Sequence, residues 1–182
     1  MPRALAATAA LFIAVTTSVV ADAKLTRTGP ARVAFHADGP AGMKIVGTTS
    51  ELDVDDRGAE MVIKVPLRNL TTGIALRDHH MRDKYLQVAT YPDAVLTVPR
   101  SAVRFPAAKG TSSGDATGAM AIHGRTKNVR FHYTIADAGG SYRVAGTTHL
   151  NIRDFGIAVP SYLGITVKPD IDVEVEFVAG GT

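Results

Sequence analysis

The sequence predicts an all-β fold, an extended antiparallel barrel of eight to ten strands with one short helix near residues 74–88. Three observations favour this class. Apolar and polar residues alternate from Ala31 onward, clusters of turn-forming residues interrupt the alternation, and a single segment changes to helical spacing. Because no series of long helices alternates with the strands, a parallel α/β sheet is disfavoured. Closure into a barrel would leave no exposed sheet edge.

The clearest strand covers residues 171–177, where every odd position is apolar and every intervening position is acidic. The same period of two predicts which side chains of the other strands point inward. The inward set is Val33, Phe35, Met43, Ile45, Met61, Ile63, Val65, Leu67, Leu96, Val98, Met120, Ile122, Val129, Phe131, Tyr133, Ile135, Tyr142, Val144, Leu150 and Ile152. Turns are predicted at residues 38–40, 55–58, 109–114 and 137–140.

An amphipathic helix is predicted over residues 74–88 from apolar residues at helical spacing, which are Ile74, Met81, Tyr85 and Val88. Asp78 falls on the same stripe. Thr71 or Thr72 is placed to cap the N-terminus of this helix, and Tyr-Pro at 91–92 returns the chain to a strand. We expect the helix to cover one mouth of the barrel.

Polar side chains are densest on this helix. The adjacent histidines, His79 and His80, point about 100° apart and cannot both face one metal ion. We therefore interpret the cluster as structural: Arg77 or Arg82 pairs with Asp78, because a carboxylate turned toward the barrel needs a partner. On this interpretation His80 hydrogen-bonds to the barrel rim and His79 is solvated. The structural polar cluster is Arg77, Asp78, His80 and Arg82.

Several classes of function are disfavoured by what the sequence lacks. Nucleophile and phosphate-loop motifs are absent, so we expect no catalytic activity and no cofactor. Lysine and arginine are scattered singly in a chain of net charge +3, which disfavours nucleic acid as a partner. The chain has no cysteine, and its remaining histidines fall on different segments, so we expect no metal. The acidic pairs Asp55–Asp56 and Asp170–Asp172 are interpreted as solvated edges.

Residues 1–23 have the features of a cleaved secretory signal peptide. Arg3 precedes an apolar run over residues 4–20, and Ala21-Asp22-Ala23 is a small-x-small cleavage site. The run is shorter than the roughly 20 residues that span a membrane, although a permanent anchor is the alternative. We expect cleavage after Ala23, a single domain over residues 24–182, and a periplasmic or secreted location.

The predicted interior is apolar and rich in methionine, whose flexible side chain suits irregular or chain-like ligands. A barrel of eight or more strands has room for one small ligand, and a filled core is the alternative. The candidate ligand-binding residues are Phe35, Met43, Ile45, Met61, Ile63, Met81, Tyr85, Leu96, Phe131, Tyr133, Phe155, Tyr162 and Leu163.

Three ordered blocks carry a family resemblance. The first is Leu-Thr-Thr-Gly at 70–73, Arg-Asp-His-His-Met-Arg at 77–82 and Tyr-Pro at 91–92; the second is Ile-His-Gly-Arg-Thr-Lys at 122–127; the third is Arg-Asp-Phe-Gly-Ile at 153–157. In these blocks the sequence resembles the YceI-like family of exported, polyisoprenoid-binding proteins. The resemblance implies a lipocalin-like barrel with a helix near one end and a tunnel for an isoprenoid tail, such as that of a quinone or polyprenyl lipid.

We therefore expect a lipid-binding protein that holds an isoprenoid or other long-chain lipid for sequestration or transport, with transient membrane contact. The short Gly-Pro-Ala-Gly turn at 39–42 predicts a smaller tunnel than many members have. A stress-protective or interaction module with a filled barrel is the alternative, and a small metal-dependent enzyme is a third hypothesis. The oligomeric state, including a dimer, stays open.

Overall fold

Alternation along each strand decides which side chains enter the barrel. In β11 (Asp170–Gly181), Phe177 is buried and its acidic neighbours Glu174 and Glu176 are exposed on the outer face. Val173 and Val175 point inward from the same strand and line the interior. The strand predicted over residues 171–177 is therefore confirmed, with its apolar side turned inward.

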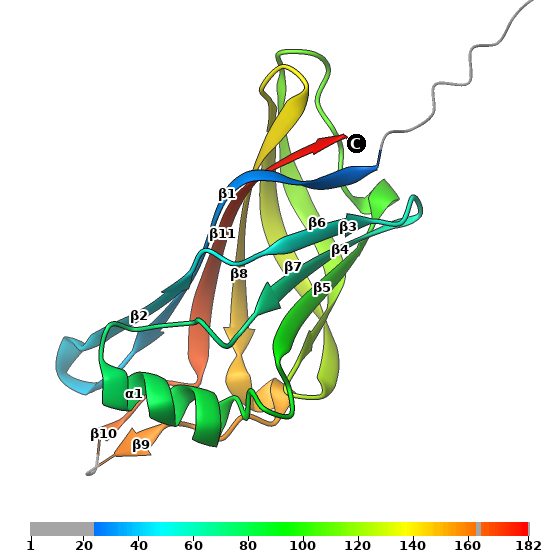
Figure 1. The fold of residues 1–182 in the computed structure, drawn as a ribbon. Coiled ribbons are helices and arrows are strands. Elements are labelled where there is room, and N and C mark those ends of the chain that lie inside the picture. The colour runs from blue at the N-terminus through cyan, green and yellow to red at the C-terminus, as the bar shows by residue number, and fades with distance from the viewer. Residues whose placement is uncertain (1–23, 163–164, 182) are drawn as a thin grey trace, which may run out of the picture.

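The computed structural model describes residues 24–162 and 165–181 (Figure 1). The strands are β1 (Leu25–Asp38), β2 (Lys44–Thr49), β3 (Asp53–Asp56), β4 (Glu60–Pro66), β5 (Asp93–Pro99), β6 (Thr111–Ile122), β7 (Arg125–Asp137), β8 (Ser141–Asn151), β9 (Ser161–Tyr162), β10 (Ile165–Thr166) and β11. The helical segments are α1 (Ala75–His79), η1 (Pro40–Gly42), η2 (His80–Tyr85), η3 (Arg100–Ala102) and η4 (Ile152–Phe155).

The main sheet is antiparallel and closes on itself. Its order is β11-β8-β7-β6-β5-β4-β3-β1-β2, and pairing of β11 with β1 joins the first eight of these strands in a ring. β1 continues past β3 and pairs with β2 from Val33 to Asp38. The short β9-β10 hairpin stands apart, near α1 at one end of the barrel (Figure 1). The predicted antiparallel barrel with one short helix is confirmed.

The barrel is filled at one end and hollow toward the other. Around the first residues of β1, a buried cluster fills the interior, with members Leu25, Met61, Val98, Val103, Ala116, Tyr133 and Ile135. α1 crosses the opposite end (Figure 1). The hollow part of the barrel therefore lies toward α1, and residues of α1 and η2 belong to its lining.

The buried carboxylate of Asp56 connects three segments at the filled end. Asp56 is 2% exposed and accepts hydrogen bonds from the backbone N–H of Leu25 (3.3 Å) and of Gly58 (2.9 Å), and from the Arg100 guanidinium. Burial raises the pKa of Asp56, but these hydrogen bonds and the Arg100 charge outweigh it, so the pKa lies below its usual value. The interpretation of Asp56 as a solvated edge is wrong, because the closed barrel brings the start of β1 over it.

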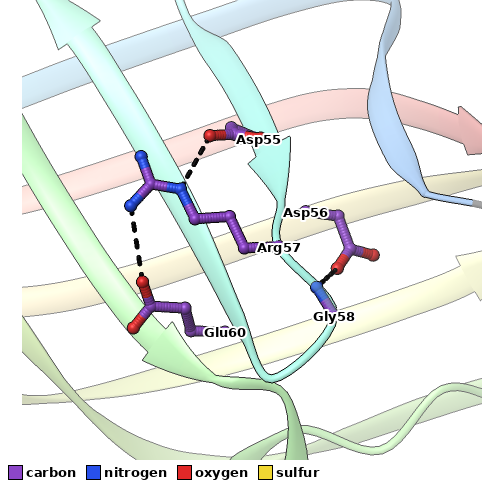
Figure 2. A network of polar contacts seen from close by, with 5 residues as sticks. All are labelled: Asp55, Asp56, Arg57, Gly58 and Glu60. Atoms are coloured by element: carbon purple, nitrogen blue, oxygen red, sulfur yellow. Dashed lines mark hydrogen bonds and ion pairs between the residues drawn. The ribbon is translucent and has the colours of Figure 1, made fainter.

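The turn between β3 and β4 holds this carboxylate in place, as Figure 2 shows. Gly58 has φ +83°, a conformation that other residues rarely adopt, and donates its N–H to Asp56. Arg57 lies on the other side of the turn, where it bonds Asp55 (2.8 Å) and reaches Glu60 (3.4 Å). Asp55 is thus solvated as predicted, while its neighbour is buried.

Two sequence predictions about local structure are wrong. The turn predicted at 109–114 ends at Gly110, since β6 begins at Thr111 and pairs with β7. Pairing with a long neighbouring strand overrides the turn preference of the Thr-Ser-Ser-Gly run. The helix is shorter than predicted: α1 begins at Ala75 and continues as the π-helical η2 to Tyr85, where the amide of Leu86 donates to the carbonyl of Met81 (2.9 Å). Within the described residues, no helix is long and apolar enough to cross a bilayer.

Candidate ligand-binding cavity

A cavity of about 550 Å³ occupies the hollow part of the barrel. Its walls come from β1, β2, β4 to β8, β11 and η4, and its cover comes from α1 and η2. The predicted ligand-binding residues that line it are Phe35, Met43, Ile45, Ile63, Met81, Tyr85, Leu96, Phe131, Tyr133 and Phe155. Nearly all of the lining is apolar, and the volume lies within the range of roughly 300–1,000 Å³ typical of small-molecule sites.

Met61, a predicted ligand-binding residue, does not line the cavity. It points inward as predicted, yet it packs in the filled-end core with Val98 and Tyr133. The period of two along a strand predicts which face a residue occupies, whereas its depth along the barrel axis follows from the stagger of the strands. The side chain of Tyr162 and the whole of Leu163 lie outside the described residues.

Other lining residues were not among the predicted site. Val144, Val173, Val175 and Phe177 complete the wall opposite β4. Their inward parity was visible in the sequence, but only strand pairing places them beside the cavity. Gly146 also belongs to the lining, although it has no side chain to contact a ligand. Its role is to leave space, because a Cβ built there would meet only the backbone O of His132, at 3.7 Å.

The floor of the cavity is a tyrosine held in one orientation. Tyr133 is 6% exposed, packs into the filled-end core and also lines the cavity. Its hydroxyl accepts a hydrogen bond from the backbone N–H of Arg104 (2.9 Å), and its ring lies 6.5 Å from that of Phe131. The buried hydroxyl is thus satisfied, which lets the ring face an apolar space at little cost.

One wall depends on the absence of a side chain. Phe35 in β1 pairs across the strands with Gly47 in β2. A Cβ on Gly47 would lie 2.0 Å from Cε1 of Phe35, so the ring rests directly over the glycine backbone. Because the Phe35 ring packs flat against the β2 backbone, it forms part of the cavity wall instead of extending into the cavity.

The helix covers the mouth through side chains that face the cavity. Arg77 of α1 and His80, Met81 and Tyr85 of the π-helical η2 all line it. His80 and Met81 are consecutive, so the wider π-helical turn presents two adjacent residues to the interior. The Tyr85 hydroxyl accepts from the backbone N–H of Ser161 (3.2 Å) and lies 3.4 Å from the Ser161 carbonyl. The end of η2 is thereby tied to β9 on the other side of the mouth.

Asp78 is buried as predicted, but its hydrogen-bond partners are threonines and not the predicted Arg77 or Arg82. Asp78 is 5% exposed and accepts from the hydroxyls of Thr71 and Thr72 (both 2.5 Å) and from the Thr72 N–H (2.7 Å). Burial raises the pKa of Asp78, but these hydrogen bonds and the nearby Arg82 charge lower it more, so the pKa falls below its usual value. The threonines therefore do not cap the helix, which begins after Ile74 without a side-chain cap.

Both arginines of the cluster bond the same loop rather than Asp78. Arg77 donates to the hydroxyl (2.7 Å) and carbonyl (2.9 Å) of Thr72, and Arg82 donates to the carbonyl of Leu70 (3.3 Å). Thr71 in turn pairs through its backbone with Thr48 in β2 (2.8 and 3.0 Å). The structural role predicted for the cluster thus takes the form of a latch, residues 70–73, that fastens the helix to the barrel.

The three sequence blocks meet in space. The Tyr91 ring lies 4.6 Å from the ring of His123, whose Nδ1 is 3.4 Å from the carbonyl oxygen of Phe155. Gly124 has φ +73°, and a Cβ there would lie 2.7 Å from the Tyr91 ring. The β6-β7 turn, the segment after the helix and η4 are therefore packed against one another.

The remaining histidines lie on the outer face. His132 is 3.0 Å from Asp115, His149 is 2.8 Å from Asp172, and on the helix His79 is 2.6 Å from Asp83. The hydrogen bond to Asp172 raises the pKa of His149 above its usual value. Among residues 24–162 and 165–181, no group of three or more metal-binding side chains converges. The pairs of His132 and His149 are thus on the outer face of the barrel wall, and the pair of His79 is on the solvent-exposed side of the helix.

Comparison with solved structures supports this fold. A structure described as a polyisoprenoid binding domain from Saccharophagus degradans, implicated in plant cell wall breakdown, superposes with a TM-score of 0.74 at 15% identity, covering 88% of this chain and 99% of that one. BcnA of Burkholderia cenocepacia superposes with a TM-score of 0.65 at 15% identity, covering 81% and 95%. At such low identity these matches establish a shared fold.

Sequence comparison is more specific. A UPF0312 protein of Pseudomonas savastanoi pv. phaseolicola is 33% identical over 137 residues, which is 70% of this chain and 68% of the relative. Another, from Pseudomonas putida strain W619, is 35% identical over 125 residues, 64% and 62% of the two chains. The family model described as the YceI-like domain matches residues 26–179, almost the whole described barrel. The chain therefore belongs to the YceI-like family.

Proposed function

We propose that this protein binds an isoprenoid or other long-chain lipid inside the barrel and holds it for sequestration or transport. The observation that carries the proposal is the cavity itself, about 550 Å³ of apolar space that opens beneath α1. Water in such a space gains few hydrogen bonds, so an apolar chain that displaces it is favoured by desolvation, at roughly 25 cal/mol per Å² buried. The polyisoprenoid binding named for the Saccharophagus degradans domain supports the choice of ligand class.

The distribution of charge orients the ligand. Arg77 and Lys168 are the charged residues of the lining, and both lie at the mouth with His80. The lining around Phe131, Val144 and Phe177 is mainly apolar. Two hydroxyls there are already engaged with the backbone, that of Tyr133 with the N–H of Arg104 and that of Thr148 with the carbonyl of Arg130 (2.8 Å). A polar head group would therefore stay at the mouth while the tail fills the barrel, because burial of an unpaired polar group costs several kcal/mol, about 2–7 by transfer data.

The hollow interior favours this function over an interaction module with a filled barrel. We also propose that the protein binds without catalysis, because the histidine–carboxylate pairs lie outside the barrel wall and not beside the cavity. The Arg77 and Asp78 side chains, which are closest to the mouth, are engaged by the threonine latch.

Extraction of the protein from its native host tests the proposal. We expect mass spectrometry of an organic extract to find one long-chain lipid in near-stoichiometric amount. Protein that yields no lipid and also fails to bind a fluorescent isoprenoid analogue would refute the proposal and favour the filled-barrel module.

Export is a separate part of the proposed function. We infer that the chain carries a signal peptide over residues 1–23 and works in the periplasm or outside the cell, on the strength of the Ala21-Asp22-Ala23 sequence. N-terminal sequencing of the protein from its host should read from Lys24. An intact N-terminus in the membrane fraction would contradict cleavage and favour the alternative, a permanent membrane anchor.

A further inference from the structure

We propose that the rim of the cavity docks on an anionic lipid bilayer, so that the bound lipid passes between membrane and barrel without crossing water. This inference rests on the proposed function for its purpose, but it stands on different observations. They are the exposed apolar side chains at the mouth and the charges beside them.

Large exposed apolar side chains are concentrated at this one place. In the part of the chain that the structure describes they are Met43 (40% exposed), Val46 (38%), Ile74 (52%) and Leu76 (57%). Met43, Ile74 and Leu76 belong to the cavity lining, and Val46 lies on the outer side of β2. They come from two segments, the β1-β2 connection and the start of α1, which lie at the same end of the barrel (Figure 1). The patch on the rim consists of Met43, Ile74 and Leu76, and Val46 points outward from β2 beside it. An exposed apolar patch of this kind marks an interaction surface.

Basic side chains surround the patch. Arg77 and Lys168 lie in the lining, and Lys44 follows Met43 at the start of β2. One carboxylate, Asp38, lies among them, and it is bound by both Lys44 (2.6 Å) and Lys168 (3.6 Å). A second carboxylate, Asp78, is buried in the latch near the charge of Arg82. With Arg82 counted, four cations against two carboxylates leave this rim positive, which complements an anionic surface.

A bilayer fits this combination better than a protein partner does, because the patch is continuous with the cavity. Met43 and Leu76 each face the solvent and the cavity, so a lipid tail leaving the barrel would pass directly between them. If these side chains sit among lipid head groups, the tail moves from one apolar medium to another. Side chains of this type insert to a depth of roughly 5–10 Å at a membrane interface.

The test is flotation of the full protein with vesicles, either of phosphatidylcholine alone or of phosphatidylcholine with phosphatidylglycerol. We expect stronger flotation with the anionic vesicles and a decrease with added salt. Lys44→Gln should weaken binding to the anionic vesicles by roughly fivefold and leave binding to neutral vesicles unchanged, since one basic residue near such a surface contributes about that factor. Lys44 lies outside the cavity lining, so ligand binding is not altered directly.

A matched pair of apolar variants isolates the rim. Leu76→Ser should weaken binding to both kinds of vesicle by about fivefold, the share expected when half of a leucine side chain is no longer buried. Val46→Ser removes a similarly exposed side chain outside the cavity and should change binding less than about twofold. Circular dichroism and thermal unfolding first confirm that the variants are folded.

Three results would overturn the proposal. Wild-type protein could stay at the bottom of the gradient with both vesicles, or the Leu76 and Val46 variants could lose binding equally. Alternatively, the protein could self-associate, with Leu76→Ser restoring the monomer, which would assign the rim to a contact between copies. Lipid recovered from the same preparation shows that the proposed function stands even when docking fails.

Discussion

The most direct test of the cavity is to fill it at Gly146. This residue lies in β8 and pairs with Tyr133 and Val175, which both line the cavity. A Cβ added there meets only the His132 backbone oxygen at 3.7 Å, an ordinary contact distance. The side chain of Gly146→Leu therefore has nowhere to go but the open centre of the barrel.

The substitution should raise stability and abolish tight binding together. Replacing a strand glycine removes an entropy cost of about 0.5–1 kcal/mol, so the free energy of unfolding in urea should rise by roughly 1 kcal/mol. A tail that shares the space with a leucine is overpacked by about 1–3 kcal/mol. Its affinity should therefore fall about 5- to 150-fold, at about 1.4 kcal/mol per factor of ten.

Titration with a fluorescent isoprenoid analogue measures the affinity, and Ala145→Leu is the matched control. Ala145 precedes Gly146 on the same strand and borders the cavity, but its own side chain is exposed. Because successive side chains of a strand point to opposite faces, Ala145→Leu adds the same side chain on the outer face. Wild-type affinity in folded Gly146→Leu protein would show that the ligand does not occupy the barrel interior.

Three further predictions concern the latch and the wall. Asp78→Ala should lower the free energy of unfolding by about 3 kcal/mol, because it removes three charge-assisted hydrogen bonds. Asp83→Ala, at an exposed position, should change the free energy of unfolding little. Equal effects of the two substitutions in urea denaturation would contradict the structural role of the latch. The pKa of Asp78 is lowered, so its contribution is present above its unfolded pKa of about 3.9 and is lost as pH falls through the folded pKa; the difference between wild type and Asp78→Asn should shrink below about pH 4. Gly47→Ala should destabilise by roughly 1–3 kcal/mol by displacing Phe35, and unchanged thermal unfolding would show that the ring moves freely.

Much of the architecture follows from the sequence alone. The strand at residues 171–177 and the inward set of the other strands were predictable, because side chains of a half-buried strand alternate with a period of two whatever their neighbours are. The helix near residues 74–88 was predictable from its apolar spacing, and the three motif blocks identified the family. Most of the predicted ligand-binding residues line the cavity for this reason, from Phe35 in β1 to Phe155 in η4.

Two features could be learned only from the tertiary structure: which residues contact one another, and how deep each inward residue lies along the barrel axis. Met61 and Ile63 have the same parity on β4, yet only Ile63 lines the cavity, because the stagger of β4 against its neighbours sets how deep each one lies. Asp55 and Asp56 are adjacent at the end of β3, where a turn was predicted, yet only Asp56 is buried, since closure of β1 against β11 brings Leu25 over it. Sequence periodicity describes one strand at a time. Eight strands enclose one interior space, which is left open beside Gly146. Whether such a space is filled depends on how the side chains of all eight strands pack together, so only the closed barrel decides it.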